Sequence, residues 1–594
     1  MSGLTTEQQN VVDAPLVPLC VIACAGSGKT KTAVHRVVQM RQNLGESRGR
    51  VALLSFSNVA VDTFRSAYDD LASSLLSGAS RSRVDIETLD GFIINNIVRP
   101  HGHRTMKSSR AAFLVTGDEI FLEGFKFQTS SFPKPINALK LAFVNGKETF
   151  FHVFNDQIEL VDESSTRKLI VRLGRTGAYT HDLGRYWAYK TLKEQPKLLA
   201  ALARRYPYVV IDEAQDIGSV HQAILELLIE AGSCVTLIGD PNQAIYQFAG
   251  ADGKFLADYH QRSGVQQHHL NKNFRSAPSI VSVASDLCGR FDRAERAEPD
   301  KLHGAFFVGY TQKQYPQLIA AFQGAMFSAG AEASRSAVLC RAKKLAGTLR
   351  GDGAPAGQGL VKLFAAAAIL RDRRQDFLKS FERVVVAVVA LLDSAPHGLV
   401  NQIMQPSGNQ TGRELRKAIW TFTRDSASGL PDSSLVANSD WHDQLLAHVK
   451  ILLVDLEKLS DLKPVANLGN KLSKKALPKV PLATSDDLAD GDATTLRIDT
   501  VHKAKGESLD AVLYIATKDH TQALLDGVSS EVGRIGYVAI TRARNLLWVA
   551  VPQNAINELR PKLLAKGFNE VGTAPAVPLV SSKSSESVDE ASSS

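Results

Sequence analysis

The chain has 594 residues, of which 44% are hydrophobic and 22% are charged. A chain of this length and ordinary composition can bury large cores, divides into about four domains, and is neither disordered throughout nor collagen-like. Its 69 lysine and arginine residues exceed its 61 aspartate and glutamate residues by 8. This excess favours a polyanionic partner only weakly, because many basic proteins bind no nucleic acid.

Cysteine usage and apolar runs indicate the compartment. The five cysteines form no CxxC pair, which disfavours a disulfide scaffold, a zinc ribbon or an iron–sulfur cluster and indicates a reducing environment. The N-terminus lacks the basic region that opens a signal peptide. The longest apolar run, residues 384–392, is far too short to span a bilayer. We therefore expect a soluble, cytoplasmic protein.

The first predicted strand, residues 19–23, leads into a glycine-containing loop at 24–30 and then into a helix-compatible stretch at 32–40. Glycines let backbone N–H groups curl around phosphate oxygens, and the N-terminus of the following helix adds a favourable dipole. In such a loop Lys29 would reach the β- and γ-phosphates and the Thr30 hydroxyl would hold Mg²⁺. The strict pattern has glycine where this chain has alanine at position 23, so the loop alone is a modest signal.

A second apolar run, residues 208–211, places Asp212 and Glu213 at its C-terminal end. Carboxylates at this edge of a parallel sheet are where α/β proteins place metal and base chemistry. Asp212 would bind Mg²⁺, and Glu213 would polarise an attacking water molecule. Such a pair alone is more often a solvated acidic turn, and the phosphate loop at Lys29 favours the catalytic interpretation.

Further strand-like runs alternate with helical stretches. Residues 234–238 lead into 239–243, and a later set of runs occupies 337–340, 495–501, 511–515 and 546–551. Strands that alternate with helices indicate doubly wound parallel sheets. The sequence therefore predicts an α/β fold with two such sheets.

The order of motifs resembles the UvrD/Rep type of superfamily 1 (1A) DNA helicase over nearly the whole chain. Motif III is the most discriminating stretch, because the other superfamily 1 branch lacks its tyrosine-x-aromatic extension. The matching stretches are 4–8 (Q motif), 23–30 (the phosphate loop, where the family tolerates alanine), 51–61 (Ia), 212–216 (II), 239–251 (III), 273–276 (IV), 500–507 (V) and 537–544 (VI).

The resemblance implies an ATP site between two motor domains. In it Gln243 would sense the γ-phosphate, Arg275 would contact it, and Arg542 would be the arginine finger. The implied catalytic residues are Lys29, Asp212, Glu213, Gln243, Arg275 and Arg542. The implied ATP-binding residues are Gln8, Ala25, Gly26, Ser27, Gly28, Lys29, Thr30, Lys31, Phe274, Arg275, Glu507 and Arg542, and the implied Mg²⁺ ligands are Thr30 and Asp212.

The resemblance also implies contacts with single-stranded DNA. Tyr246 and Phe248 would offer stacking surfaces to bases, which is a sequence-tolerant interaction. Such an aromatic pair is in isolation more often core packing, and only its fixed distance from Gln243 favours DNA. The implied DNA-binding residues are Phe56, Asn58, Tyr246, Phe248 and His502.

The family's domain plan predicts two RecA-like doubly wound parallel-sheet motor domains with mostly helical inserted subdomains. Boundaries placed on this sequence are 1–95 with 201–268 (motor domain 1A), 96–200 (subdomain 1B), 269–351 with 489–565 (motor domain 2A), 352–488 (a reduced subdomain 2B) and 566–594 (a disordered serine-rich tail).

Three positions depart from the family pattern. Asp90 stands where motif Ib usually has histidine, and its charge would be unfavourable near a DNA phosphate unless it faces away. In motif V, Glu507 directly follows a glycine, and Ser508 takes the position of the family's ribose-binding glutamate. Ala249 replaces an arginine that often follows the motif III aromatic.

The leading functional hypothesis is an ATP- and Mg²⁺-dependent helicase or translocase on single-stranded DNA, with 3′→5′ direction, in repair, recombination or phage defence. It would bind single-stranded and tailed duplex DNA and a nuclease or other repair or defence partner, but no membrane. The alternative is an ATP-gated DNA-binding subunit of a nuclease complex with little unwinding of its own. It is motivated by Asp90 and by a compact 2B without the glycine-isoleucine-glycine grip on duplex. A third, weaker hypothesis has RNA as the track.

Overall fold

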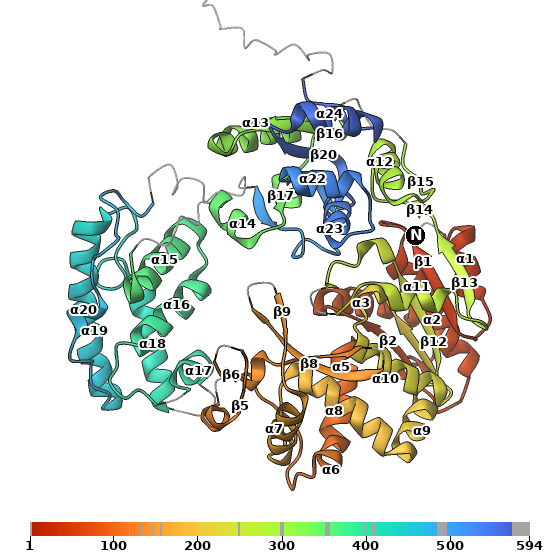
Figure 1. Ribbon diagram of the computed structural model, residues 1–594, viewed down its shortest axis with the longest axis horizontal. Helices are drawn as coiled ribbons and strands as arrows, with labels where there is room; N and C mark the ends of the chain where they lie inside the picture. The colour runs from red at the N-terminus through yellow and green to blue at the C-terminus, as the bar shows by residue number, and fades with distance from the viewer. Residues whose placement is uncertain are drawn as a thin grey trace, which may run out of the picture.

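The computed structural model describes residues 3–572, apart from 118, 131, 145, 155–156, 248–249, 298–301, 351–356, 397, 407–409 and 484–495. Figure 1 shows two parts that contain parallel sheets, at the right and at the top, with an inserted part below and a helical inserted part at the left. None of the described helices combines the length and apolar character needed to cross a membrane.

The first sheet has six parallel strands in the order β13-β1-β12-β11-β2-β3. Its central strands are buried on both faces, which explains why they are continuous apolar runs in the sequence. Helices α2 (Lys29–Leu44) and α3 (Asn58–Leu75) pack on one face. The strands are β1 (Leu19–Ala23), β2 (Val51–Ser55), β3 (Val84–Thr88), β11 (Tyr208–Ile211), β12 (Cys234–Gly239) and β13 (Gln266–Leu270).

The second sheet also has six parallel strands, in the order β18-β17-β19-β20-β16-β21. Its strands are β16 (Gly304–Tyr310), β17 (Ala337–Cys340), β18 (Arg497–Thr500), β19 (Leu509–Ile515), β20 (Ala543–Pro552) and β21 (Asn569–Glu570). The helices that cover it are α12 (Pro278–Cys288), α13 (Tyr315–Ser328), α22 (Lys518–Leu525), α23 (Glu531–Ile540) and α24 (Ile556–Ala565). The predicted α/β class with parallel sheets is confirmed.

The C-terminal boundary differs from the prediction. Residues 569–570 fall within the predicted tail, but they form β21 and pair with β16. Their pairing satisfies backbone groups at the edge of the sheet. The serine-rich stretch from 573 onward lies outside the described residues.

The first insertion, between β3 and β11, combines helices with a small sheet. A π-helix (Ile94–Gly102) continues α5 (Leu89–Ile93), and the main helices are α7 (Glu163–Arg175), α8 (His181–Glu194) and α9 (Pro196–Arg205). Beside them lies an antiparallel sheet that the sequence did not predict, made of β7 (Lys140–Val144), β8 (Lys147–Phe154) and β9 (Gln157–Leu160). The insertion shares one hydrophobic core with a face of the first sheet, so Trp187 of α8 and Leu54 of β2 belong to the same cluster.

The second insertion is helical in its described residues and closes a core of its own around Trp441 and Phe381. Arg371 is buried there, where it pairs with Asp372 and donates to the Leu430 and Pro431 carbonyls. The helices are α15 (Gly359–Arg374), α16 (Phe377–Val389), α17 (Leu399–Met404), α18 (Gln410–Arg424), α19 (His442–Ser460) and α20 (Leu468–Lys471).

Candidate nucleotide and DNA site

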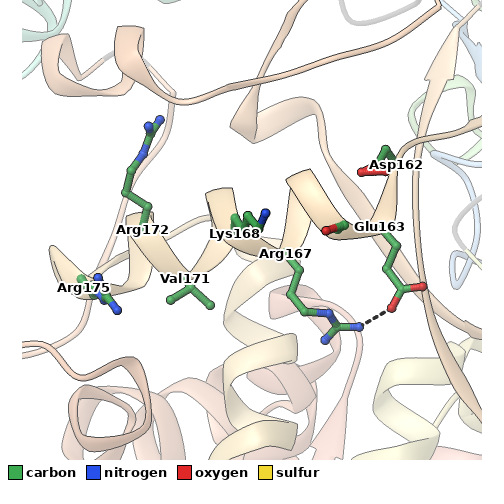
Figure 2. A pocket seen from close by; sticks show the side chains of 8 residues that line it. Asp162, Glu163, Arg167, Lys168, Val171, Arg172 and Arg175 are labelled. Atoms are coloured by element: carbon green, nitrogen blue, oxygen red, sulfur yellow. Dashed lines mark hydrogen bonds and ion pairs between the residues drawn. The ribbon is translucent and has the colours of Figure 1, made fainter.

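An open cavity of about 890 Å³ lies along one face of α7 in the first insertion (Figure 2). Two of its arginines already have protein partners. Arg167 pairs with Glu163 and Glu148, and Arg172 donates to the Gly124 carbonyl. Its lining contains no glycine, and it combines two acidic residues at the N-terminus of α7, Asp162 and Glu163, with basic side chains further along the helix, so it does not resemble a phosphate-binding loop.

A second cavity, of about 380 Å³, lies between the two sheets. Its walls come from the loop between β1 and α2, from the ends of β11 and β12, and from three segments joined to the second sheet. The lining residues are Ala25, Gly26, Ser27, Gly28, Lys29, Thr30, Glu213, Gln243, Phe274, Arg275, Gly506, Ser508, Arg542 and Arg544.

The glycines of the loop between β1 and α2 cannot be replaced without strain. Gly26 and Gly28 have φ of +69° and +79°, in the left-handed region that favours glycine. A Cβ at Gly26 would lie 2.5 Å from the Cβ of Arg275, and one at Gly28 would lie 2.6 Å from Nε2 of Gln8. The loop delivers the N-terminus of the 16-residue helix α2 to the cavity, which suits a phosphate group.

Three residues that the resemblance assigned to ATP do not line this cavity. Gln8 supports the glycine loop from outside, because its Nε2 donates to the Ser27 carbonyl at 3.0 Å. Lys31 donates to the Gly3 carbonyl at 3.2 Å. Glu507 forms an ion pair with Arg497 at 2.6 Å, and Ser508 lines the cavity instead.

Asp212 and Glu213 follow β11 and lie beside the glycine loop. Glu213 has a left-handed backbone (φ +54°), and its Oε1 lies 3.9 Å from Nζ of Lys29. Burial alone would raise the pKa of Glu213, but the charges of Lys29 and Lys505 outweigh it and lower the pKa. Burial and the charge of Glu213 raise the pKa of Asp212. A cation that neutralised this pair would therefore be stabilised.

The residues fit a Mg²⁺ ion held with phosphate and water oxygens. Asp212 is 4% exposed, and its Oδ1 is buried without a hydrogen-bond partner, so an oxygen-seeking cation would satisfy it. Thr30 contributes a hydroxyl at the cavity wall. Among the described residues no group of three or more acidic, histidine or cysteine side chains could cage a metal ion alone. Mg²⁺ usually keeps water and phosphate ligands, so this donor set suits it.

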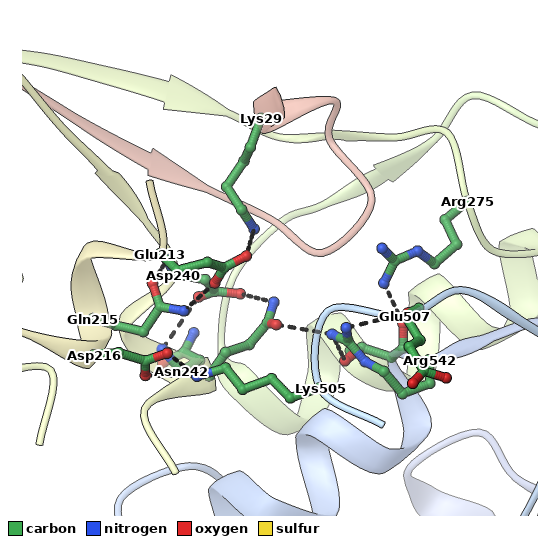
Figure 3. Close-up of polar contacts among 12 residues, drawn as sticks. Lys29, Glu213, Gln215, Asp216, Asp240, Asn242, Arg275, Lys505, Glu507 and Arg542 are labelled. Carbon is green, nitrogen blue, oxygen red and sulfur yellow. Dashed lines mark hydrogen bonds and ion pairs between the residues drawn. The ribbon is translucent and has the colours of Figure 1, made fainter. Parts of the chain in front are cut away.

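Polar contacts cross the cleft between the two sheets (Figure 3). Arg542, between α23 and β20, is 2% exposed, and its Nη2 donates to Oε1 of Gln243 at 2.8 Å. Its remaining nitrogens donate to the Val538 and Glu507 carbonyls. Arg275 donates to the Thr541 carbonyl at 3.1 Å. The predicted γ-phosphate residues from both sheets are therefore brought together.

The cavity has an excess of positive charge. Burial and the nearby charge of Arg542 lower the pKa of Arg275 to about 9, and burial also lowers the pKa of Arg542. Arg544, the last residue of the motif VI stretch, also lines the cavity, although no role was predicted for it. Guanidinium groups that repel one another in a confined space favour a polyanion between them.

Two of the predicted DNA-binding residues meet at the junction of the sheets. The rings of Tyr246 and His502 are 5.9 Å apart, and Nζ of Lys505 lies 4.7 Å from the Tyr246 ring. Lys505 also forms a buried ion pair with Asp216, at 2.6 Å, that joins the two sheets. Phe248, predicted to act with Tyr246, lies outside the described residues.

The other two predicted DNA-binding residues follow β2. The Phe56 ring is half-buried and meets the His221 ring edge-on at 5.8 Å. Asn58 is exposed at the start of α3, whose N-cap is Ser57. These residues are not among those that line the cavity.

Asp90, whose charge was expected to disfavour DNA, is compensated within the protein. Arg185 donates to both of its carboxylate oxygens, at 2.7 and 2.6 Å, and Nε2 of His221 lies 2.9 Å from Oδ1. Burial would raise the pKa of Asp90, but these partners hold it well below its usual range. The carboxylate of Asp90, on α5, therefore connects that helix to Arg185 on α8 and to His221 on α10 (Ser219–Glu230).

Replacing Asp90 by asparagine should destabilise this junction. We expect a loss of roughly 1 kcal/mol in the free energy of unfolding, less than is usual for hydrogen bonds to charged groups, because the carboxylate is 42% exposed. Since the folded pKa is depressed, the stabilisation is present above the unfolded pKa and is lost as the pH falls through the folded pKa. Amide hydrogen exchange at pH 7 should be faster in α5 and α8. The exposed Asp62→Asn variant is the control, and equal exchange in both variants would contradict the assignment.

Comparison with known proteins agrees with the motif analysis. Residues 4–263 match the UvrD/REP helicase N-terminal domain family. The chain is 24% identical to YjcD of Bacillus subtilis (strain 168), over 93% of this chain and 79% of that protein. It is 21% identical to the ATP-dependent DNA helicase UvrD2 of Mycobacterium tuberculosis (strain ATCC 25618 / H37Rv), over 92% and 78%. It is 23% identical to DNA helicase II of Escherichia coli (strain K12), over 48% and 40%.

The match of residues 4–263 and the similarity to these relatives confirm the predicted resemblance to UvrD/Rep-type helicases.

Proposed function

We propose that this protein is an ATP-dependent DNA helicase or translocase that moves 3′→5′ on single-stranded DNA. The observation that carries the proposal is the contact of Arg542 with Gln243 across the cleft, beside the glycine loop. Two helicase relatives are similar to this chain over about half of its length or more. The motif order and the relatives support DNA as the nucleic acid along which the protein moves and ATP as the nucleotide that it hydrolyses.

The geometry supports a definite division of labour in ATP hydrolysis. The glycine loop and Lys29 would hold the phosphates, and Arg275 and Arg542 would approach from the other sheet. Glu213, with a lowered pKa, is ionised at neutral pH and can accept a hydrogen bond from the attacking water. Mg²⁺, held by Thr30 and Asp212, would neutralise charge on the phosphates.

Movement would follow from the position of the site between two sheets. ATP would bridge Lys29 and the arginines, and hydrolysis would remove the bridge, so the cleft would close and open once per cycle. Tyr246 and His502 lie where the two sheets meet. Closure of the cleft would therefore change the relative positions of residues proposed to contact DNA.

The test is ATP hydrolysis with and without single-stranded DNA, together with displacement of a 3′-tailed and a 5′-tailed duplex. We expect strong stimulation by DNA and displacement of the 3′-tailed duplex. Preferential displacement of the 5′-tailed duplex would overturn the direction. Stronger stimulation by RNA of the same sequence would overturn DNA as the track.

Stimulation without displacement would favour the regulatory subunit of a nuclease complex. One of the motives for that alternative is weakened by the structure, since the charge of Asp90 is compensated by Arg185 and His221. The compact second insertion still supports the alternative of a regulatory subunit. Displacement at rates that match ATP turnover would exclude the alternative.

A further inference from the structure

Arg290 joins the two sheets next to the ATP cavity, although no motif contains it. It follows α12, which packs with β16 in the second sheet part, and its side chain is 16% exposed. Its Nη1 lies 2.9 Å from Oδ1 of Asp240. Asp240 directly follows β12 of the first sheet and is fully buried. The ion pair therefore connects one sheet to the other.

The guanidinium of Arg290 is fixed from a second side. Its Nε and Nη2 donate to the two carboxylate oxygens of Asp292, at 2.8 and 2.9 Å. Its Nη2 also donates to the hydroxyl of Tyr537, on α23, at 3.2 Å. A planar guanidinium that is held by Asp292 and Tyr537 has little freedom to move. The position of the nitrogen that faces Asp240 is therefore set by the part of the protein that contains the second sheet.

Asp240 passes this constraint to Gln243. The Nε2 of Gln243 donates to Oδ2 of Asp240 at 2.9 Å, while its Oε1 accepts from Arg542 at 2.8 Å. An ionised carboxylate can only accept and a guanidinium can only donate, so both neighbours impose the same orientation on the carboxamide. Arg290, Asp240, Gln243 and Arg542 form one chain of contacts that starts and ends on the part that contains the second sheet (Asp240 and Arg542 are labelled in Figure 3).

The orientation of Gln243 depends on Asp240 being ionised. Burial alone would raise the pKa of Asp240, but Arg290 outweighs it and the pKa is lowered. A protonated Asp240 could donate a hydrogen bond and would no longer select the amide nitrogen of Gln243. The carboxamide could then turn over and present its nitrogen to Arg542.

We propose that Arg290 is a positioning residue for ATP hydrolysis, which acts through Asp240 to hold the carboxamide oxygen of Gln243 towards Arg542 and the γ-phosphate side of the cavity. Because Arg290 moves with the second sheet part, it imposes this orientation only when the sheets are together. The inference rests on the proposed function of Gln243 as the γ-phosphate sensor. It adds a second connection, besides Arg542, through which closure of the cleft controls hydrolysis.

The experiment measures DNA-stimulated ATP hydrolysis of the full chain between pH 5.5 and 8.5, with poly-dT as the DNA. For Arg290→Gln we expect kcat to fall roughly 10- to 100-fold, with the KM for ATP changed much less, because a misplaced group costs rate rather than binding. Burial of Asp240 is then no longer outweighed by Arg290, so its pKa should rise and the acid limb of kcat should move to higher pH. Arg290→Lys keeps the charge without the fork, so it should keep the acid limb near that of the wild type and recover part of kcat.

Two further variants separate positioning from a merely structural role. Asp240→Asn cannot titrate, so the Arg290→Gln substitution should cause no further shift of the acid limb in that background. Arg293→Gln removes an exposed arginine on β15 (Arg293–Ala294), three residues along the chain, and should behave like the wild type. If Arg290→Gln fails to fold, Arg290→Lys and Asp240→Asn still decide the question through kcat and its pH dependence.

The inference would be overturned if Arg290→Gln matched the wild type in kcat, or if kcat fell with no movement of the acid limb. Failure of the proposed function is distinguishable, since wild-type protein would then show no hydrolysis. In that case binding of a fluorescent ATP analogue still tests whether Arg290 acts through Asp240 on Gln243. Protection of Gln243 from hydrogen exchange on nucleotide binding should be lost in Arg290→Gln, and its persistence would contradict the role of Arg290.

Discussion

Replacing Lys29 by alanine is expected to reduce DNA-stimulated ATP hydrolysis by about 10³-fold or more, to the background of the assay. Lys29 is the first residue of α2 and lines the cavity, with Nζ 3.9 Å from Glu213. Its removal would delete the cation nearest the phosphate loop and leave Glu213 with less compensation. The measurement is steady-state phosphate release with and without single-stranded DNA.

The matched control for this variant is Lys197→Ala, which removes an exposed lysine on α9, away from the cavity. It should leave turnover unchanged. Retained DNA-stimulated turnover in pure Lys29→Ala protein would refute the placement of the ATP site. A wild-type thermal unfolding curve for the variant would show that the loss is chemical rather than structural.

Replacing Arg542 has the second largest expected effect. An arginine supplied to a transferring phosphoryl group contributes roughly 10³–10⁵ in kcat, so we expect Arg542→Ala to lose about 10³-fold. Arg542→Lys should recover little, because one ammonium cannot reproduce the bonds to Gln243 and to the Val538 and Glu507 carbonyls. Single-turnover hydrolysis of prebound ATP isolates the chemical step from binding.

Binding of a fluorescent ATP analogue should change far less than kcat in the Arg542 variants, because the glycine loop and Lys29 remain. Since Arg542 is buried, its loss removes the hydrogen bonds that it donates to the Val538 and Glu507 carbonyls, and near-UV circular dichroism should verify the fold. A single-turnover rate within threefold of the wild type would show that Arg542 does not act on the transferred group.

Central strands of both sheets could be located from the sequence for a physical reason. Parallel strands buried on both faces are continuous apolar runs, so 208–211 and 337–340 coincide with β11 and β17. The edge strand β13, with the sequence Gln-Gln-His-His-Leu, gives no such run. The strands β7 to β9 of the first insertion were missed as well, because much of each strand is exposed and none is a continuous buried run.

Residues that line the cavity between the sheets were predictable where a local pattern fixes them. The glycine loop and the Arg542 stretch are contiguous, and the structure brings them to one cavity. Glu507 was assigned from motif V, in which this chain has glutamate one residue earlier than the family pattern. In the structure Ser508 lines the cavity, and Glu507 pairs with Arg497. The pair of Arg290 with Asp240 joins residues 50 positions apart, and nothing local in the sequence marks it.

The two insertions differ in what further change they can absorb. The first shares its hydrophobic core with β2 and β11, so a substitution at Trp187 is transmitted to strands of the first sheet, including β11, which leads to Glu213 at the cavity. The second closes its own core around Trp441. A change in the length or packing of the second insertion is therefore absorbed within its own core and does not reach the cavity between the sheets.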